Sequence, residues 1–322
     1  MTDARKIWID CDPGVDDTVA IAMLTNTPQF EIVGISTVFG NATIEKTTRN
    51  AKVVMEAANL DHLPLARGAS RPLCVPLDTS PFVHGNNGLG DMNLPETTMV
   101  ESNRRAPQAI IDAILSEPHK ITLLAIGPLT NLAIAYLLDE EICALVDEVV
   151  IMGGAVFCAG NITPAAEANF YHDPHAAQIV LSAGFPITLA GLDVNNQAMV
   201  PNALLEKVCD ASKPLSPLIA GSTPFYRQFL ESIGVFDLVD FPDALAAAYL
   251  LQPGLFTSNR LPVFVETEGN CAGQTLALPD GKWYQDPGDQ KHFKPDEKCG
   301  VINILEHVDQ KGFLALFEEI LT

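Results

Sequence analysis

The chain has 322 residues, 48% of them hydrophobic, and its 19 Lys and Arg against 40 Asp and Glu give a formal charge of −21. A balance this acidic disfavours nucleic acid and anionic membrane surfaces as partners, and no apolar run reaches the ~18 residues of a membrane span. Seven cysteines without zinc-type spacing, and an N-terminus that leads into a strand instead of a secretory apolar region, favour a cytoplasmic protein with reduced thiols.

The predicted elements alternate between short apolar strands and helices. Strands are predicted at 6–10, 31–38, 63–66, 121–126, 148–152, 186–190 and 261–268, and helices at 44–58, 107–116, 129–138 and 174–182. This alternation is typical of βαβ units, so we expect an α/β fold with a doubly wound, mostly parallel sheet and helices on both faces. No domain boundary is visible, and we expect one domain over residues 1–322. The long segments 67–105 and 221–243 have the length of active-site lids, the second containing a helix.

The first predicted strand runs into residues 10–17, DCDPGVDD, and an apolar helical stretch follows at 18–24. Alternation along the strand puts Asp10 and Asp12 on one face, and the Pro-Gly turn returns Asp16 and Asp17 to their side. Four carboxylates in so small a volume repel one another, and a hard cation such as Ca²⁺ or Mg²⁺ relieves that repulsion. Asp16 or Asp17 could instead cap the helix, which would explain one or two of the four.

Polar or glycine-rich segments follow other predicted strands, at 38–41, 126–131, 152–154 and 191–195. Parallel α/β sheets bind ligands beyond the carboxyl ends of their strands, so one site can collect all of these segments. No Gly-x-Gly-x-x-Gly or Walker-type loop is present, and a nucleotide cofactor is therefore not indicated.

Six blocks resemble, in order, the motifs of the nucleoside hydrolase family of the inosine-uridine preferring type. They are DCDPGVDD at 10–17, TVFGN at 37–41 with KTTRNA at 46–51, HGNNGLG at 84–90, IGPLTN at 126–131, VIMGG at 150–154, and GNITPAAEAN at 160–169 with Asp-Pro at 173–174. Haloacid-dehalogenase-type phosphatases also begin with Asp-x-Asp after a strand. In that class Gly14 would stand where Thr or Val is expected, and Asp16 and Asp17 would have no role.

The resemblance implies the nucleoside hydrolase fold and Ca²⁺-dependent hydrolysis of the N-glycosidic bond of ribonucleosides to free base and ribose. It implies that Ca²⁺ is held by Asp12, Asp17, the main-chain carbonyl of Ile126 and Asp243, with Asp10 bracing them from behind. Asp12 would also take the proton of the attacking water, and Asn41 would orient that water. A dimer or tetramer is implied as well.

The same resemblance implies the ribose contacts. Asp16 and Asn169 would hold the 2′- and 3′-hydroxyls, Asn161 and Glu167 the 5′-hydroxyl, and Met152 would pack on the sugar. Clustered carboxylate and amide oxygens suit this reaction because bond cleavage builds positive charge on the ribosyl ring. Taken singly, these polar residues could also be turn, capping or solvated loop groups. For His84, contact with the 5′-hydroxyl or base and mere ordering of its loop remain open.

One position departs from the family pattern. A histidine or tryptophan is expected immediately before the last metal aspartate, and this chain has Pro242 there. A proline cannot supply the general-acid help that is typically worth ~10²–10⁴ in rate. Tyr226, Arg227 or His84 could replace it, the base could leave with little protonation, or the protein could bind ribosides without efficient turnover. Our hypothesis is that hydrolysis is retained.

Overall fold

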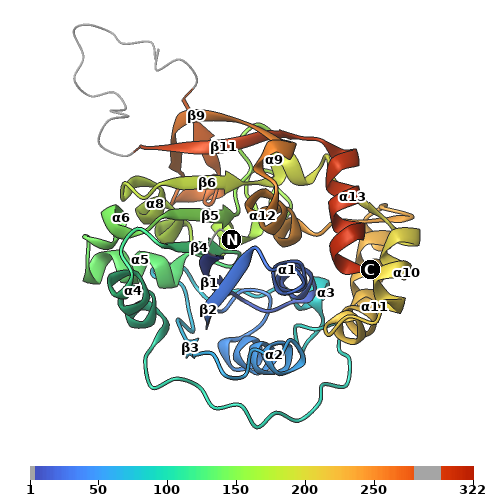
Figure 1. Ribbon diagram of the computed structural model, residues 1–322. Helices are drawn as coiled ribbons and strands as arrows, with labels where there is room; N and C mark the ends of the chain where they lie inside the picture. The colour runs from blue at the N-terminus through green and yellow to red at the C-terminus, as the bar shows by residue number, and fades with distance from the viewer. Residues whose placement is uncertain (1–3, 279–298) are drawn as a thin grey trace, which may run out of the picture.

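The computed structural model describes residues 4–278 and 299–322, and a nine-stranded sheet forms its centre (Figure 1). The strand order is β10-β9-β11-β6-β5-β4-β1-β2-β3, and among the described strands of this sheet β9 alone runs against the others. The strands are β1 (Arg5–Cys11), β2 (Phe30–Thr37), β3 (Leu65–Arg67), β4 (Ile121–Ala125), β5 (Glu148–Met152), β6 (Ile187–Ala190), β9 (Phe256–Val265), β10 (Thr275–Ala277) and β11 (Gly300–Val308). Two further strands, β7 (Val200–Pro201) and β8 (Leu238–Val239), pair separately.

Helices cover both faces of the sheet, which confirms the predicted doubly wound, mostly parallel architecture. One face carries α4 (Ala106–Ser116), α5 (Thr130–Leu138), α6 (Ile142–Leu145) and α8 (Pro174–Ser182). The other carries α1 (Val15–Thr25), α2 (Ile44–Ala57), α9 (Leu192–Asn195), α12 (Pro242–Leu251) and α13 (Gln310–Leu321), with α10 (Asn202–Asp210) and α11 (Ser216–Ser232) packed outside them. A separate apolar core fills the space on each face.

The last part of the sheet differs from the prediction. The strand expected at 261–268 runs from Phe256 to Val265 and pairs antiparallel with β11, and neither β11 nor α13 was predicted. Buried parallel strands give continuous apolar runs, whereas the first half of β9 is largely exposed and β11 mixes buried with exposed positions. The apolar signal that identified the central strands is therefore weak here.

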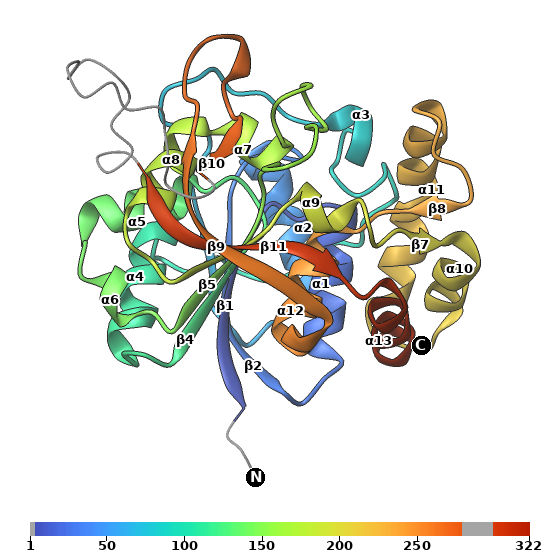
Figure 2. The ribbon, with the colours of Figure 1, turned by 90° about the horizontal axis from the view of Figure 1, so that it is seen from above.

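The carboxyl ends of the parallel strands face the side of the molecule on which α3 (Pro81–His84) and α7 (Ala168–His172) lie (Figure 2). Helix α1 starts at this edge directly after β1. Its residues from Val15 to Leu24 are all buried, as expected of a helix whose residues after Thr18 are apolar on every side up to Leu24. Helix α12 packs against α1 and begins at the same edge, so two helix N-termini meet there.

Candidate functional site

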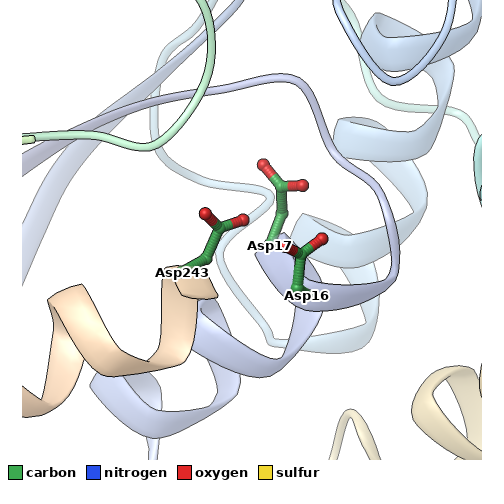
Figure 3. A group of neighbouring side chains, drawn as sticks. All are labelled: Asp16, Asp17 and Asp243. Carbon is green, nitrogen blue, oxygen red and sulfur yellow. The ribbon is translucent and has the colours of Figure 1, made fainter. Parts of the chain in front are cut away.

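Three aspartates from two helices form the centre of the site. Asp16 and Asp17 stand in the first turn of α1 and Asp243 in the first turn of α12, and one carboxylate oxygen of each lies within 4.8 Å of the others (Figure 3). All three are buried. Helix N-termini favour negative charge, which helps two helix starts to hold three carboxylates together.

Asp17 also hydrogen-bonds to the backbone at the start of α1, which agrees with the prediction that it could cap this helix. Its Oδ2 accepts hydrogen bonds from the N–H of Gly14 at 2.8 Å and from Asn41 Nδ2 at 3.0 Å, and its Oδ1 accepts from the N–H of Asp12 at 3.2 Å. A Cβ at Gly14 would lie 2.6 Å from Asn41 Nδ2 and 2.7 Å from a ring nitrogen of His84. Glycine at this position therefore permits the close approach of both side chains.

Asp12 lies just beneath the three aspartates. Its Oδ2 accepts a 2.7 Å hydrogen bond from the N–H of Asn41, whereas its Oδ1 is buried without a hydrogen-bond partner, as is Oδ1 of Asp16. Buried oxygen atoms are normally satisfied by a partner. Orphaned carboxylate oxygens beside a carboxylate cluster fit a hard divalent cation, which prefers oxygen ligands.

Burial and mutual repulsion dominate the electrostatics of this cluster. Burial first and the charge of Asp16 second raise the pKa of Asp17 to about 8. Burial raises the pKa of Asp16 to about 6. The pKa values of Asp12 and Asp243 rise well above the usual range, through burial and through neighbouring aspartates. Without compensating positive charge, the cluster therefore holds protons at neutral pH.

Asp10 sits behind the cluster, and its carboxylate hydrogen-bonds to residues outside the cluster. Its Oδ1 accepts hydrogen bonds from Ser36 Oγ at 2.5 Å and from Asn131 Nδ2 at 2.8 Å, and burial raises its pKa to about 6. Asn131 also donates to the carbonyl of Thr37 and accepts from the N–H of Ala69. This network ties the ends of β1 and β2 to α5.

The floor of the adjoining pocket is polar. Asn169 Nδ2 donates to the carbonyl of Ile126 at 3.1 Å and to that of Met152 at 3.2 Å, which joins α7 to the ends of β4 and β5. The Glu167 carboxylate caps α7 by accepting from the N–H groups of Asn169 and Phe170, and it also accepts from that of Gly154. Asn161 is exposed, and its Oδ1 accepts from the N–H of Ala168.

An aromatic wall faces the same pocket. The rings of His84 and Tyr226 stack with centroids 5.8 Å apart, and Tyr226 Oη donates to Asp240 Oδ1 at 2.9 Å. The N–H of Val15 donates to His84 Nδ1 at 3.4 Å, and burial lowers the pKa of this imidazole to about 4. His84 is therefore neutral at pH 7, and its 3.9 Å approach to Asp16 is no ion pair there.

One pocket collects most of the predicted site residues. Its lining includes Asp16, Asn41, His84, Ile126, Met152, Asn161, Glu167, Asn169, Tyr226 and Asp243, whereas Asp10, Asp12 and Asp17 are buried beneath it. Other lining residues were not predicted from the sequence. They are Asp240 and five apolar residues that we call the apolar rim, namely Phe82, Val83, Phe229, Leu230 and Ile233. The only sequence feature that could have suggested Asp240 as a site residue is its position three residues before Asp243. The rim residues carry no motif, because the approach of α3 to α11 depends on the tertiary fold.

Comparison with known proteins places this arrangement in context. The family profile described as "Inosine-uridine preferring nucleoside hydrolase" matches residues 7–315. The chain is 40% identical to uridine nucleosidase 1 of Arabidopsis thaliana over 274 residues, covering 84% of this chain and 81% of that protein. It is 37% identical to the inosine-uridine preferring nucleoside hydrolase of Crithidia fasciculata over 276 residues, covering 85% and 87%.

Solved structures agree with the sequence relatives. A plant nucleoside hydrolase superimposes with a TM-score of 0.90 at 30% identity and covers 99% of each chain. A purine-preferring ribonucleoside hydrolase from Gardnerella vaginalis superimposes with a TM-score of 0.88 at 28% identity and covers 98% of each. The phosphatase alternative finds no support in these matches. Within the described residues, no helix is long and apolar enough to span a membrane.

Proposed function

The chain belongs to the inosine-uridine preferring nucleoside hydrolase family and is an N-ribosylhydrolase, and we propose that it uses Ca²⁺ to hydrolyse ribonucleosides to free base and ribose. The observation that carries this proposal is the convergence of Asp16, Asp17 and Asp243 on a pocket whose floor is polar. A ribose offers hydroxyls to such a floor, and an oxocarbenium-like ribosyl group gains most from clustered carboxylates.

For the cation we propose Asp12, Asp17, Asp243 and the carbonyl of Ile126 as ligands. Asp16 is close enough to compete for the same position, since its carboxylate belongs to the cluster of three. The all-oxygen donor set and the orphaned Oδ1 of Asp12 support Ca²⁺ or a similar hard ion. When bound, the cation supplies positive charge that makes water more acidic.

Each residue around the cation has a distinct role in the proposed reaction. Asp12 accepts the proton of the attacking water, and Asn41 orients that water through its Oδ1, because its Nδ2 is committed to Asp12 and Asp17. Asp16 and Asn169 hold the 2′- and 3′-hydroxyls. Asp10 acts only through its neighbours, keeping the end of β1 in place.

The remaining proposed contacts are to the ribose ring, its 5′-hydroxyl and the base. Met152 packs on the ribose, and Asn161 and Glu167 bind the 5′-hydroxyl, although Glu167 is already committed to three N–H groups. His84 and Tyr226 flank the base. Segments 67–105 and 221–243 form lids over the pocket, since each contributes residues to its wall and rim.

The proposal also covers the domain organisation, the oligomeric state and the cellular location of the protein. The chain forms one domain over residues 1–322 and assembles as a dimer or tetramer, which light scattering of the purified protein would test. It acts in the cytoplasm, in keeping with Cys11, Cys74, Cys143, Cys158, Cys209 and Cys271, none of which forms a disulfide.

The test is hydrolysis of inosine, adenosine, guanosine, uridine and cytidine, each with Ca²⁺ and with chelator, in phosphate-free buffer. We expect release of base and ribose that requires Ca²⁺. One observation favours a second candidate, a riboside-binding protein with weak turnover: Pro242 lines the pocket and offers no proton. Ribose binding without release of any base would support that alternative.

A further inference from the structure

A departing base that needs a proton must take it from the pocket, and Pro242 cannot supply one. Three groups on the wall built by α3, α11 and the segment before α12 can carry a proton: His84, Tyr226 and Asp240. The carboxylates of the floor are needed for the sugar and the cation. The choice of proton donor is therefore confined to this wall.

His84 is poorly suited to donate. Its Nδ1 accepts from the N–H of Val15, so the ring carries its one proton on Nε2, and burial keeps it neutral. A neutral imidazole is a weak acid at neutral pH. His84 instead stacks on Tyr226 with an interplanar angle of 19°, which fixes the plane of the phenol.

Tyr226 and Asp240 form an ordered pair. Tyr226 Oη lies 2.9 Å from Asp240 Oδ1, and Asn195 Nδ2 on α9 donates to Asp240 Oδ2 at 3.1 Å. Both oxygens of Asp240 are thus engaged, and the carboxyl group is fixed from two elements. Tyr226 and Asp240 line the same pocket as Pro242, the apolar rim and the polar floor, so both can reach a base whose ribose is held by that floor.

We propose that Asp240, anchored by Asn195, is a positioning residue that makes the Tyr226 hydroxyl the proton donor to the leaving base. This inference rests on the proposed hydrolysis. In the resting protein Tyr226 Oη donates to Asp240, so the reacting form needs one further proton, which Asp240 takes up from solvent. As the N-glycosidic bond breaks, its electron pair passes to the base, Tyr226 Oη gives its proton to the base, and the carboxyl proton of Asp240 passes to Tyr226 Oη. The attacking water loses its proton to Asp12, and the exchange of protons with solvent restores both aspartates after release.

The surroundings favour the protonated forms of both groups. Burial, followed by the charge of Asp16, raises the pKa of Asp240 against the opposing hydrogen bonds from Asn195 and Tyr226. Burial and the charges of Asp240, Asp16 and Asp243 raise the pKa of Tyr226 well above its usual value, so the phenol stays protonated.

The test compares two leaving groups. Uridine needs a proton on its base, whereas 4-nitrophenyl riboside releases a stabilised phenolate that needs none. For Y226F and D240N we expect kcat on uridine to fall ~10²–10⁴-fold with little change in KM, and kcat on 4-nitrophenyl riboside to stay within about tenfold of wild type. Asn195→Ala leaves the pair in place but frees Asp240, so we expect a smaller loss confined to uridine.

Matched controls are Y249F, whose hydroxyl lies near Glu148, and D112N, whose carboxylate pairs with Arg104 at the surface. Both should match wild type on both substrates. Equal losses on the two substrates in D240N and N195A, or full uridine activity in either Y226F or D240N, would overturn the assignment of Asp240. Wild-type protein inactive on both substrates would overturn the proposed hydrolysis, and this assignment with it.

Discussion

Asp17 and Asp243 stand in the first turns of α1 and α12, and the packing of these two helices brings their carboxylate oxygens within 4.8 Å. Both carboxylates are buried, and the hydrogen bonds that Asp17 accepts come from two backbone N–H groups and one side-chain amide, which carry no net charge. The packing of two buried helices therefore brings these acidic groups together, and we propose that a bound cation compensates their charge.

Removing Asp243 should abolish cation binding without harming the fold. We expect Asp243→Asn to lower Ca²⁺ affinity by more than the ~10–100-fold typical of groups that only support a ligand, and to reduce turnover accordingly. The calcium-free variant should be as stable as wild type or more so, because one buried like charge is lost. Calorimetric titration with Ca²⁺ and thermal melting measure both, with Asp112→Asn as control. Unchanged Ca²⁺ affinity would remove Asp243 from the ligand set.

Stability of the calcium-free protein should fall as pH rises. The folded state keeps a proton on Asp17 up to about pH 8, whereas the unfolded chain releases it near 3.8, so this group costs stability across that window. The slope is at most about 1.4 kcal/mol per pH unit for one group. Urea denaturation between pH 5 and 8 should show the decline in chelator and little of it in Ca²⁺. Identical profiles in the two buffers would contradict the account.

Glu167 should contribute to folding as well as to the pocket. Its carboxylate caps α7, and loss of such a cap typically costs ~0.5–2 kcal/mol. Glu167→Ala should therefore lower the free energy of unfolding by about that amount and raise KM. Glu141 at the start of α6 makes no side-chain cap bond, so Glu141→Ala should change stability by less than ~0.5 kcal/mol. Equal effects of the two substitutions would argue against the cap.

His84 should remain neutral across the physiological range. Its pKa is lowered by burial to about 4, so the folded state resists protonation and loses stability as pH falls from about 6.5 toward 4. Protonation would also break the hydrogen bond from Val15 to Nδ1. An NMR titration of the His84 ring should show its midpoint near pH 4. A midpoint between pH 6 and 7 would show that the ring is more solvated than the packing indicates.

The features that depend on local sequence pattern were the ones predicted from the sequence. The central parallel strands, the turn after β1 and the convergence of segments 38–41, 126–131 and 152–154 on one pocket were predicted from apolar runs and from the sheet rule, whereas segment 191–195 does not line that pocket. The cluster partner of Asp16 and Asp17 was found only through resemblance, because nothing local marks Asp243. The bond between Tyr226 and Asp240 lay beyond prediction, since it depends on how α11 meets the segment before α12.

The part of the sheet formed by β9 and β11 was also not predicted correctly from the sequence. β9 and β11 form an antiparallel pair whose partly exposed residues dilute the apolar signal. Local periodicity thus predicted the buried centre, and tertiary contacts determined the rim and the aromatic wall.

The most direct test of the central claim is a Ca²⁺ titration of chelator-treated protein, with uridine hydrolysis and Ca²⁺ binding followed in the same samples. The account predicts that ribose release appears with Ca²⁺ and saturates together with binding at a single site per chain, and that Asp17→Asn abolishes both. Full ribose release in chelator, or Ca²⁺ binding at this site without release of ribose from any nucleoside, would contradict it.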